Sequence, residues 1–192
     1  LHGQLRTVEF KEEWSMGSIL SESLEEELER HNREMQRTRN YIRGKRKKSE
    51  FELCVIGNYN MFYEQALEAV QGIRSLWTEN AVDSEYDALE AAEVQPPVKK
   101  DRKPLYLCHG DLDQHHVLMG GNYTAIIEYN RMHLGVQSTD LYRFMRKVME
   151  KHNWNVDLGR SMMDAYERVL DMSAKEMRCL YYMFLYPEKY WK

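Results

Sequence analysis

The stretch that decides the fold runs from residue 107 to residue 119 and reads Leu-Cys-His-Gly-Asp-Leu-Asp-Gln-His-His-Val-Leu-Met. A short apolar run ends in a His-Gly-Asp turn whose last residue is Asp111, and His116 opens a second apolar run. A Gly-Gly-Asn turn then leads to the apolar run 123–127, which is followed by Glu128. Asp111, His116 and Glu128 therefore lie at strand ends or turns, where polar side chains can converge on one point.

Working outward, the sequence predicts a mainly α-helical chain with a small β element. The expected strands are 105–108, 116–119 and 123–127, with residues 120–122 as a hairpin turn. We expect four consecutive parts, which are a helical part at 1–77, a linker at 78–104, the β element at 105–135 and C-terminal helices at 136–192. The linker holds three of the four prolines and one expected helical turn, 87–92.

Apolar residues at spacings of three and four predict the helices, at 18–44, 49–77, 140–152, 157–170 and 173–185. Ser49 can cap the second helix, whose apolar stripe is expected to begin at Phe51. Ser173 and Glu176 have the spacing of a capping box at the start of the last helix.

Composition excludes several classes of protein. The chain has 27 basic and 31 acidic residues, so no overall field favours nucleic acid or an anionic membrane, and neither is expected as a partner. No apolar run approaches the roughly 18 residues of a membrane span. Three scattered cysteines indicate a reducing, cytoplasmic environment. The basic run at 45–48 admits a nucleic-acid interpretation, but we favour a solvated helix end whose cations complement the helix dipole.

Two catalytic classes fit the central stretch poorly. His109, Asp111, Asp113, His115 and His116 are possible zinc ligands, yet side chains two apart along a turn rarely point the same way, and no second cluster completes the shell. A serine hydrolase would need a nucleophile elbow, and no Gly-x-Ser-x-Gly occurs. A phosphotransferase fits better, because it needs one carboxylate to accept a hydroxyl proton and further groups to hold magnesium on the nucleotide phosphates.

The motifs His109-Gly110-Asp111-Leu112, His116-Val117-Leu118, Ile126-Ile127-Glu128-Tyr129 and Asp140-Leu141-Tyr142, in this order, resemble the aminoglycoside phosphotransferase/choline kinase superfamily. The CotS-type spore coat branch is more similar still, through 86–89, 140–154 and the aromatic end 186–191. The opening Leu1-His2 is similar to the pair that follows the N-terminal lobe in that branch. The resemblance therefore implies a protein kinase-like C-terminal lobe, with the N-terminal lobe absent from this chain.

The resemblance also implies roles for single residues. Asp111 matches the catalytic base, and His109 matches a structural part of the catalytic loop. Asp140 matches an acid that supports that loop by hydrogen bonds. His116 stands where the family has a metal-binding Asn, and Glu128 where it has the main metal-binding Asp. Both metal positions are thus altered, since imidazole is a poor magnesium ligand and Glu is one methylene longer than Asp.

These departures leave two hypotheses open. The chain is expected to be a pseudokinase or a structural and interaction component, with the missing N-terminal lobe or other spore coat proteins as partners. Its expected location is the mother-cell cytoplasm or the spore coat. The alternative is a phosphotransferase that uses ATP with Mg²⁺ or Mn²⁺ once an N-terminal lobe is present. No cofactor is expected to bind this chain alone, because it has no glycine-rich phosphate loop.

Overall fold

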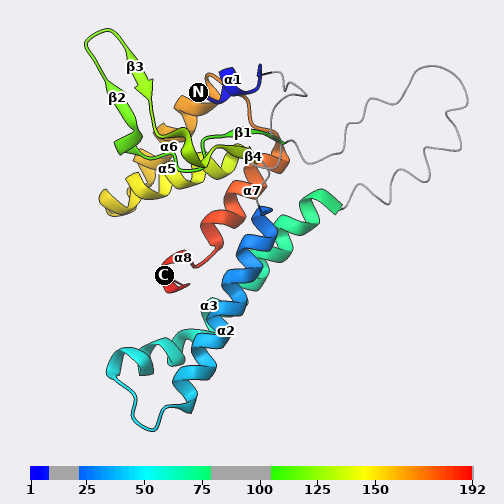
Figure 1. Cartoon of the computed structure of the whole chain (residues 1–192), viewed down its shortest axis with the longest axis vertical. Helices are drawn as coiled ribbons and strands as arrows, with labels where there is room; N and C mark the ends of the chain where they lie inside the picture. Colours follow the sequence, from blue (N-terminus) through cyan, green and yellow to red (C-terminus); the bar gives the residue numbers. More distant parts are fainter. Residues whose placement is uncertain (9–21, 79–104, 192) are drawn as a thin grey trace, which may run out of the picture. The chain divides into compact units, whose positions relative to one another are not determined.

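The computed structural model describes residues 1–8, 22–78 and 105–191. They form two compact units (Figure 1). The described part of unit 1 comprises 1–8, 22–23 and 105–184, and that of unit 2 comprises 24–78 and 185–191. The structure is mainly helical with two small sheets, which confirms the predicted fold class. Nearly all of the predicted linker, with its turn at 87–92, lies outside the described residues, and the division into four parts stays a prediction.

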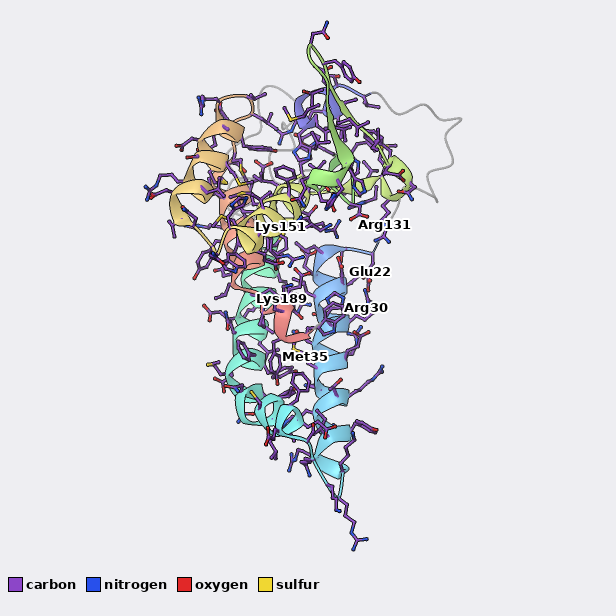
Figure 2. All side chains as sticks on the ribbon, turned by 90° about the vertical axis from the view of Figure 1, so that its left-hand side faces the viewer. Glu22, Arg30, Met35, Arg131, Lys151 and Lys189 are labelled. Carbon is purple, nitrogen blue, oxygen red and sulfur yellow. The ribbon has the colours of Figure 1, made fainter. Side chains whose placement is uncertain are left out.

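Unit 2 is built on two antiparallel helices, α2 (Leu24–Gly44) and α3 (Glu50–Thr78) (Figure 1). Their inward faces carry apolar residues three and four positions apart, so both helices bury a continuous stripe. Figure 2 shows Met35 on the side of α2 that faces α3, and only 4% of its surface is exposed. The buried apolar residues of the pair are Leu28, Met35, Ile42, Tyr59, Ala66, Ala69, Val70, Ile73 and Leu76.

The predicted start of α3 is confirmed. Ser49 Oγ accepts the Glu52 N–H at 3.2 Å, and the Ser49 N–H donates to Glu52 Oε2 at 2.9 Å, which is a capping box. Phe51, expected to be buried, is 76% exposed. It lies in the first turn of α3, next to the turn that joins the two helices. The start of α2 is Leu24; residues 18–21, where a helix was predicted, lie outside the described part.

The C-terminal aromatic segment packs on the helical pair. It contains the short helix α8 (Glu188–Trp191), which the sequence did not predict. The Trp191 ring stacks on His31 with 3.6 Å between centroids, and its Nε1–H donates to Glu34 Oε2 at 2.9 Å. The Tyr190 hydroxyl donates to the Val55 carbonyl at 2.6 Å. These contacts tie the end of the chain to both α2 and α3.

Unit 1 contains two separate two-stranded antiparallel sheets. Strand β2 (Val117–Met119) pairs with β3 (Thr124–Ile126), which confirms the predicted hairpin. The remaining predicted strand, at 105–108, corresponds to β1 (Tyr106–Cys108). It does not join the hairpin and pairs with β4 (His133–Gly135), which the sequence did not predict. The sequence did not predict β4, because its three residues include a single apolar side chain, that of Leu134.

Four α-helices complete the part of unit 1 that the structure describes. They are α1 (His2–Leu5), α5 (Ser138–Lys151), α6 (Val156–Glu167) and α7 (Ala174–Leu185), whose last residue belongs to unit 2. The predicted capping box is confirmed, since the Ser173 N–H donates to Glu176 Oε2 at 2.9 Å and the Glu176 N–H donates to Ser173 Oγ at 3.2 Å. No helix in the described ranges combines the length and the apolar character needed to cross a bilayer.

We predict that Trp191→Ala lowers the free energy of unfolding by about 2 kcal/mol, because it removes the stacking on His31 and the bond to Glu34. Urea unfolding followed by circular dichroism measures the change. Trp154→Ala is the matched control, since Trp154 is 48% exposed and a smaller loss is expected there. Equal losses in the two variants would contradict the role assigned to the C-terminal segment.

Candidate functional site

The candidate site is built around the turn that follows β1, at residues 109–111. Gly110 has a φ of 84°, in the left-handed region that glycine adopts readily. A Cβ atom at this position would lie 2.0 Å from the Arg131 carbonyl oxygen and 2.9 Å from His133 Nδ1. Only glycine therefore fits between the two neighbouring segments. The backbone N–H groups of His109 and of Gly110 itself are turned toward the start of α5.

Asp140, in the first turn of α5, accepts a hydrogen bond from each of these two amides. Its Oδ2 accepts the His109 N–H at 2.5 Å, and its Oδ1 accepts the Gly110 N–H at 2.9 Å. Asp140 has 0% of its surface exposed. Burial by itself disfavours the carboxylate, but the hydrogen bonds from His2 and from the two amides outweigh it and lower the pKa of Asp140. The side chain is therefore a buried anion that holds the turn.

His2 supplies the third contact to Asp140, and sequence reasoning did not identify it as a site residue. Its Nε2 lies 3.3 Å from Asp140 Oδ2, and its Nδ1 lies 2.7 Å from the Tyr166 hydroxyl. Burial raises the pKa of Tyr166 to about 12, so the hydroxyl keeps its proton and donates it to Nδ1. The imidazole then carries its hydrogen on Nε2 and donates to Asp140. The chain Tyr166–His2–Asp140 thus joins α6 and α1 to the turn.

His109 joins the same turn to the end of β3. Its Nε2–H donates to the Ile127 carbonyl at 2.8 Å, and its Nδ1 accepts the Asp111 N–H at 3.3 Å. The side chain is fully buried, and its ring lies 4.8 Å from the Tyr129 ring. The two bonds fix the tautomer and the orientation of the imidazole, and they leave neither nitrogen for another ligand. His109 therefore holds the turn in place.

Asp111, the predicted base, projects from the turn with 36% of its side chain exposed. Lys147 Nζ lies 3.8 Å from Oδ1, and Arg131 Nε lies 3.8 Å from Oδ2. At these distances and exposures, each pair adds little to stability. The pairs do place positive charge on both sides of the carboxylate.

Asp113 is buried close to Lys147 and has a structural role. Its Oδ1 accepts the His115 N–H at 2.7 Å, which caps the short helix η3 (Gln114–His116), and its Oδ2 accepts from Lys147 Nζ at 2.6 Å. Burial opposes ionisation of Asp113, yet these bonds prevail and lower its pKa to about 2. Asp113 is therefore an anion at neutral pH, and Lys147 is its main partner.

Lys147 and Arg143 were also missed by sequence reasoning. Arg143 donates to the Gly110 carbonyl oxygen, so it holds the turn from the opposite end of the peptide. Both residues follow Asp140 on α5, at three and seven positions, which places all three on one helix face. That spacing was visible in the sequence. It would have identified the face of α5 that carries every contact to the turn.

The two predicted metal positions have different surroundings. The His116 Nδ1–H donates to the Asp111 carbonyl oxygen at 2.6 Å, which leaves only Nε2 with a lone pair. Glu128 is exposed, has left-handed backbone angles of φ 66° and ψ 52°, and makes no side-chain hydrogen bond or ion pair within the described residues. Within 1–8, 22–78 and 105–191, no three His, Cys, Asp or Glu side chains are placed to hold a metal ion.

Comparison with known proteins gives one informative result. No protein-family model matches the chain, and no curated protein matches it. A crystal structure of an aminoglycoside phosphotransferase from Alicyclobacillus acidocaldarius subsp. acidocaldarius is similar, with a TM-score of 0.67 and 15% sequence identity. The fold is that of a kinase-like phosphotransferase. The similarity covers 92% of this chain and 49% of that protein, so the chain spans about half of that protein's length.

A shared fold does not establish a shared reaction. The kinase-like fold agrees with the resemblance noted in the sequence. The roles inferred for Asp111, His109, Asp140, His116 and Glu128 stay predictions. The structure adds their placement. His109 and Asp111 lie in the turn, and Asp140 on α5 accepts hydrogen bonds from its amides. His116 is hydrogen-bonded to the turn, and Glu128 is a solvent-exposed residue that follows Ile127.

We predict that Gly110→Ala lowers the free energy of unfolding by about 2 to 4 kcal/mol, because the new Cβ would collide with the Arg131 carbonyl at a positive φ. Gly121→Ala is the control in the hairpin turn, where a Cβ meets nothing within 4 Å; a change below about 0.5 kcal/mol is expected. Chemical unfolding of both variants measures the difference. An unchanged free energy of unfolding in Gly110→Ala would show that the turn is not constrained as described.

Proposed function

We propose that this chain is the C-terminal lobe of a kinase-like protein whose phosphotransfer site no longer holds a divalent cation, and that it serves as a binding or structural component. The observation that carries the proposal is the hydrogen bond from His116 to the Asp111 carbonyl. It commits the side chain at one predicted metal position to the backbone of the turn. The fold similarity to a phosphotransferase supports the ancestry that this proposal requires.

His116 supports the turn in place of a ligand. Magnesium takes oxygen ligands in near-octahedral geometry, so an imidazole at this position is a poor donor even where its nitrogen is free. Here Nδ1 is occupied, and the ring lies 5.8 Å from the His109 ring. The substitution therefore exchanges an oxygen donor for a residue that stabilises the loop between Asp111 and η3.

Glu128 weakens the site further. A Glu carboxylate extends one methylene beyond an Asp carboxylate, which is a large displacement for a cation that tolerates little error in geometry. Glu128 is also exposed, so its carboxylate can remain hydrated at little cost. Asp111, in turn, has Arg131 and Lys147 nearby, and these cations can balance its charge without a metal.

An active phosphotransferase is the second candidate. Asp111 favours it, because the carboxylate is retained, partly open to solvent and carried on a turn held by Asp140 and His109. In this case an N-terminal lobe would bind ATP, and Mg²⁺ or the more tolerant Mn²⁺ would be needed. The substrate would be a small molecule or a coat protein. Transfer lost on Asp111→Asn in the protein with both lobes would establish this candidate.

The biological setting is also a proposal. The similarity of the motifs to the CotS-type branch supports a role in sporulation, either in the mother-cell cytoplasm or in the spore coat. Other coat proteins, or an N-terminal lobe that packs on this chain, are then the partners. Nothing in the geometry of the site depends on that setting.

The test restores the family's residue types. We predict that His116→Asn combined with Glu128→Asp raises the affinity for Mn²⁺ at least tenfold over the natural sequence, because two oxygen donors then face the turn. Paramagnetic broadening of the Gly110 and Asp111 amide signals on Mn²⁺ titration locates the ion. The control is His115→Asn with Glu167→Asp, the same changes at two exposed positions.

The proposal would be contradicted if Mn²⁺ already broadened the Gly110 signal in the natural sequence at the concentration that saturates the restored variant. That result would favour the enzyme. Broadening in neither protein would also count against the proposal, because it would show that the two substitutions are not what removed the site.

A further inference from the structure

Figure 1 shows the turn that joins α2 to α3, at the lower end of the helical pair. Cations and exposed apolar residues gather in the sequence at and beside this turn. We call this cluster the basic tip. It consists of the cations Arg43, Arg46, Lys47 and Lys48 and of the exposed apolar side chains Tyr41, Phe51 and Leu53. The proposed function does not use this surface.

The charges of the basic tip are not neutralised internally. Arg43, Arg46 and Lys47 are exposed and make no hydrogen bond or ion pair with any residue that the structure describes. Lys48 donates to a backbone carbonyl at 2.7 Å, which leaves its positive charge uncompensated. Lys45 differs, because its Nζ pairs with Glu52 at 2.5 Å; it is therefore left out of the tip.

Complementing a helix dipole explains only part of this charge. Arg43 lies in the last turn of α2, where a cation is favourable. Arg46, Lys47 and Lys48 lie beyond that helix and immediately before α3, whose first turn begins at Glu50. The N-terminus of a helix carries partial positive charge, so three cations there repel it and one another. Glu50 and Glu52 lie in that turn, but Glu52 pairs with Lys45, so the four cations of the tip keep a net positive charge.

The apolar members make the tip amphipathic. Phe51 is 76% exposed, Tyr41 is 67% exposed and Leu53 is 57% exposed. All three lie within about two helical turns of the cations along α2 or α3. A segment that combines unpaired Lys and Arg with exposed aromatic and aliphatic side chains is suited to the boundary between lipid headgroups and acyl chains.

We propose that the basic tip docks on an anionic lipid surface, with its cations on the headgroups and with Phe51 and Leu53 inserted at the acyl boundary. The tip is formed by the turn of a helical hairpin, between Gly44 and Glu50. A Leu side chain gains from insertion into lipid and offers no ring for base stacking. The chain's net charge of −4 opposes general adsorption, so the contact is confined to this end of the helices.

The test measures binding of the whole chain to vesicles by co-sedimentation. Phosphatidylcholine vesicles are compared with vesicles that also contain phosphatidylglycerol. We expect binding only to the anionic vesicles, and weaker binding as salt is added. Each cation near such a surface contributes about fivefold to partitioning, so Arg46→Gln/Lys47→Gln/Lys48→Gln should lower it about a hundredfold. Phe51→Ser tests insertion and should lower it about tenfold.

The control variant is Arg33→Gln/Lys151→Gln/Arg178→Gln, which changes the net charge equally at three exposed positions that are not part of the tip. It should bind anionic vesicles as tightly as the natural chain. The proposal is overturned if the control loses as much binding as the tip variant, or if the natural chain does not sediment with anionic vesicles at low salt. Tighter, tip-dependent binding to a single-stranded RNA oligonucleotide would overturn it in favour of nucleic acid.

Discussion

The rest of unit 1 depends on one buried carboxylate, that of Asp140. Removing a carboxylate from water costs several kcal/mol unless hydrogen bonds replace the lost hydration. Asp140 receives three donors, namely the amides of His109 and Gly110 and the imidazole of His2. Because each donor comes with a fixed piece of backbone, satisfying the charge also fixes the turn after β1 against the start of α5.

This arrangement separates the shape of the site from its chemistry. The turn is held by Asp140, His109 and Arg143, and none of these contacts involves the predicted metal positions. Glu128, which makes no hydrogen bond or ion pair with the turn, can therefore change while the turn keeps its geometry, whereas His116 itself donates to the Asp111 carbonyl. Retention of the turn alone is consequently weak evidence for phosphate transfer.

The long elements could be predicted from the sequence because their signals are local. Helix α3 shows apolar periodicity over many turns, and Ser49 and Ser173 each begin a capping box. Strands β2 and β3 are equally short, but apolar runs and a Gly-Gly-Asn turn mark them, whereas β4 contains one apolar residue and α8 spans a single turn. Phe51 fitted the apolar stripe of its helix, yet whether a partner covers a residue depends on where the neighbouring helix ends.

The candidate site likewise contains some residues that could be predicted from the sequence and others that could not. The His-Gly-Asp turn was visible as a motif, and Asp140 was found by resemblance. His2 lies far from Asp140 in the sequence, and only tertiary folding brings the two together. Lys147 could have been found, because it lies two helical turns after Asp140 on the same face of α5. The exposure of Glu128 and the bond from His116 to a backbone carbonyl could not be read from residue types.

The most direct test of this account is amide hydrogen exchange at His109 and Gly110, compared between the natural chain and Asp140→Asn. An asparagine keeps the shape but can accept with one oxygen only, so at least one of the two amides loses its acceptor. The account predicts slow exchange of both amides in the natural chain and at least tenfold faster exchange of one or both in the variant. Unchanged exchange at both amides would contradict it, because the turn would then be held without the Asp140 carboxylate.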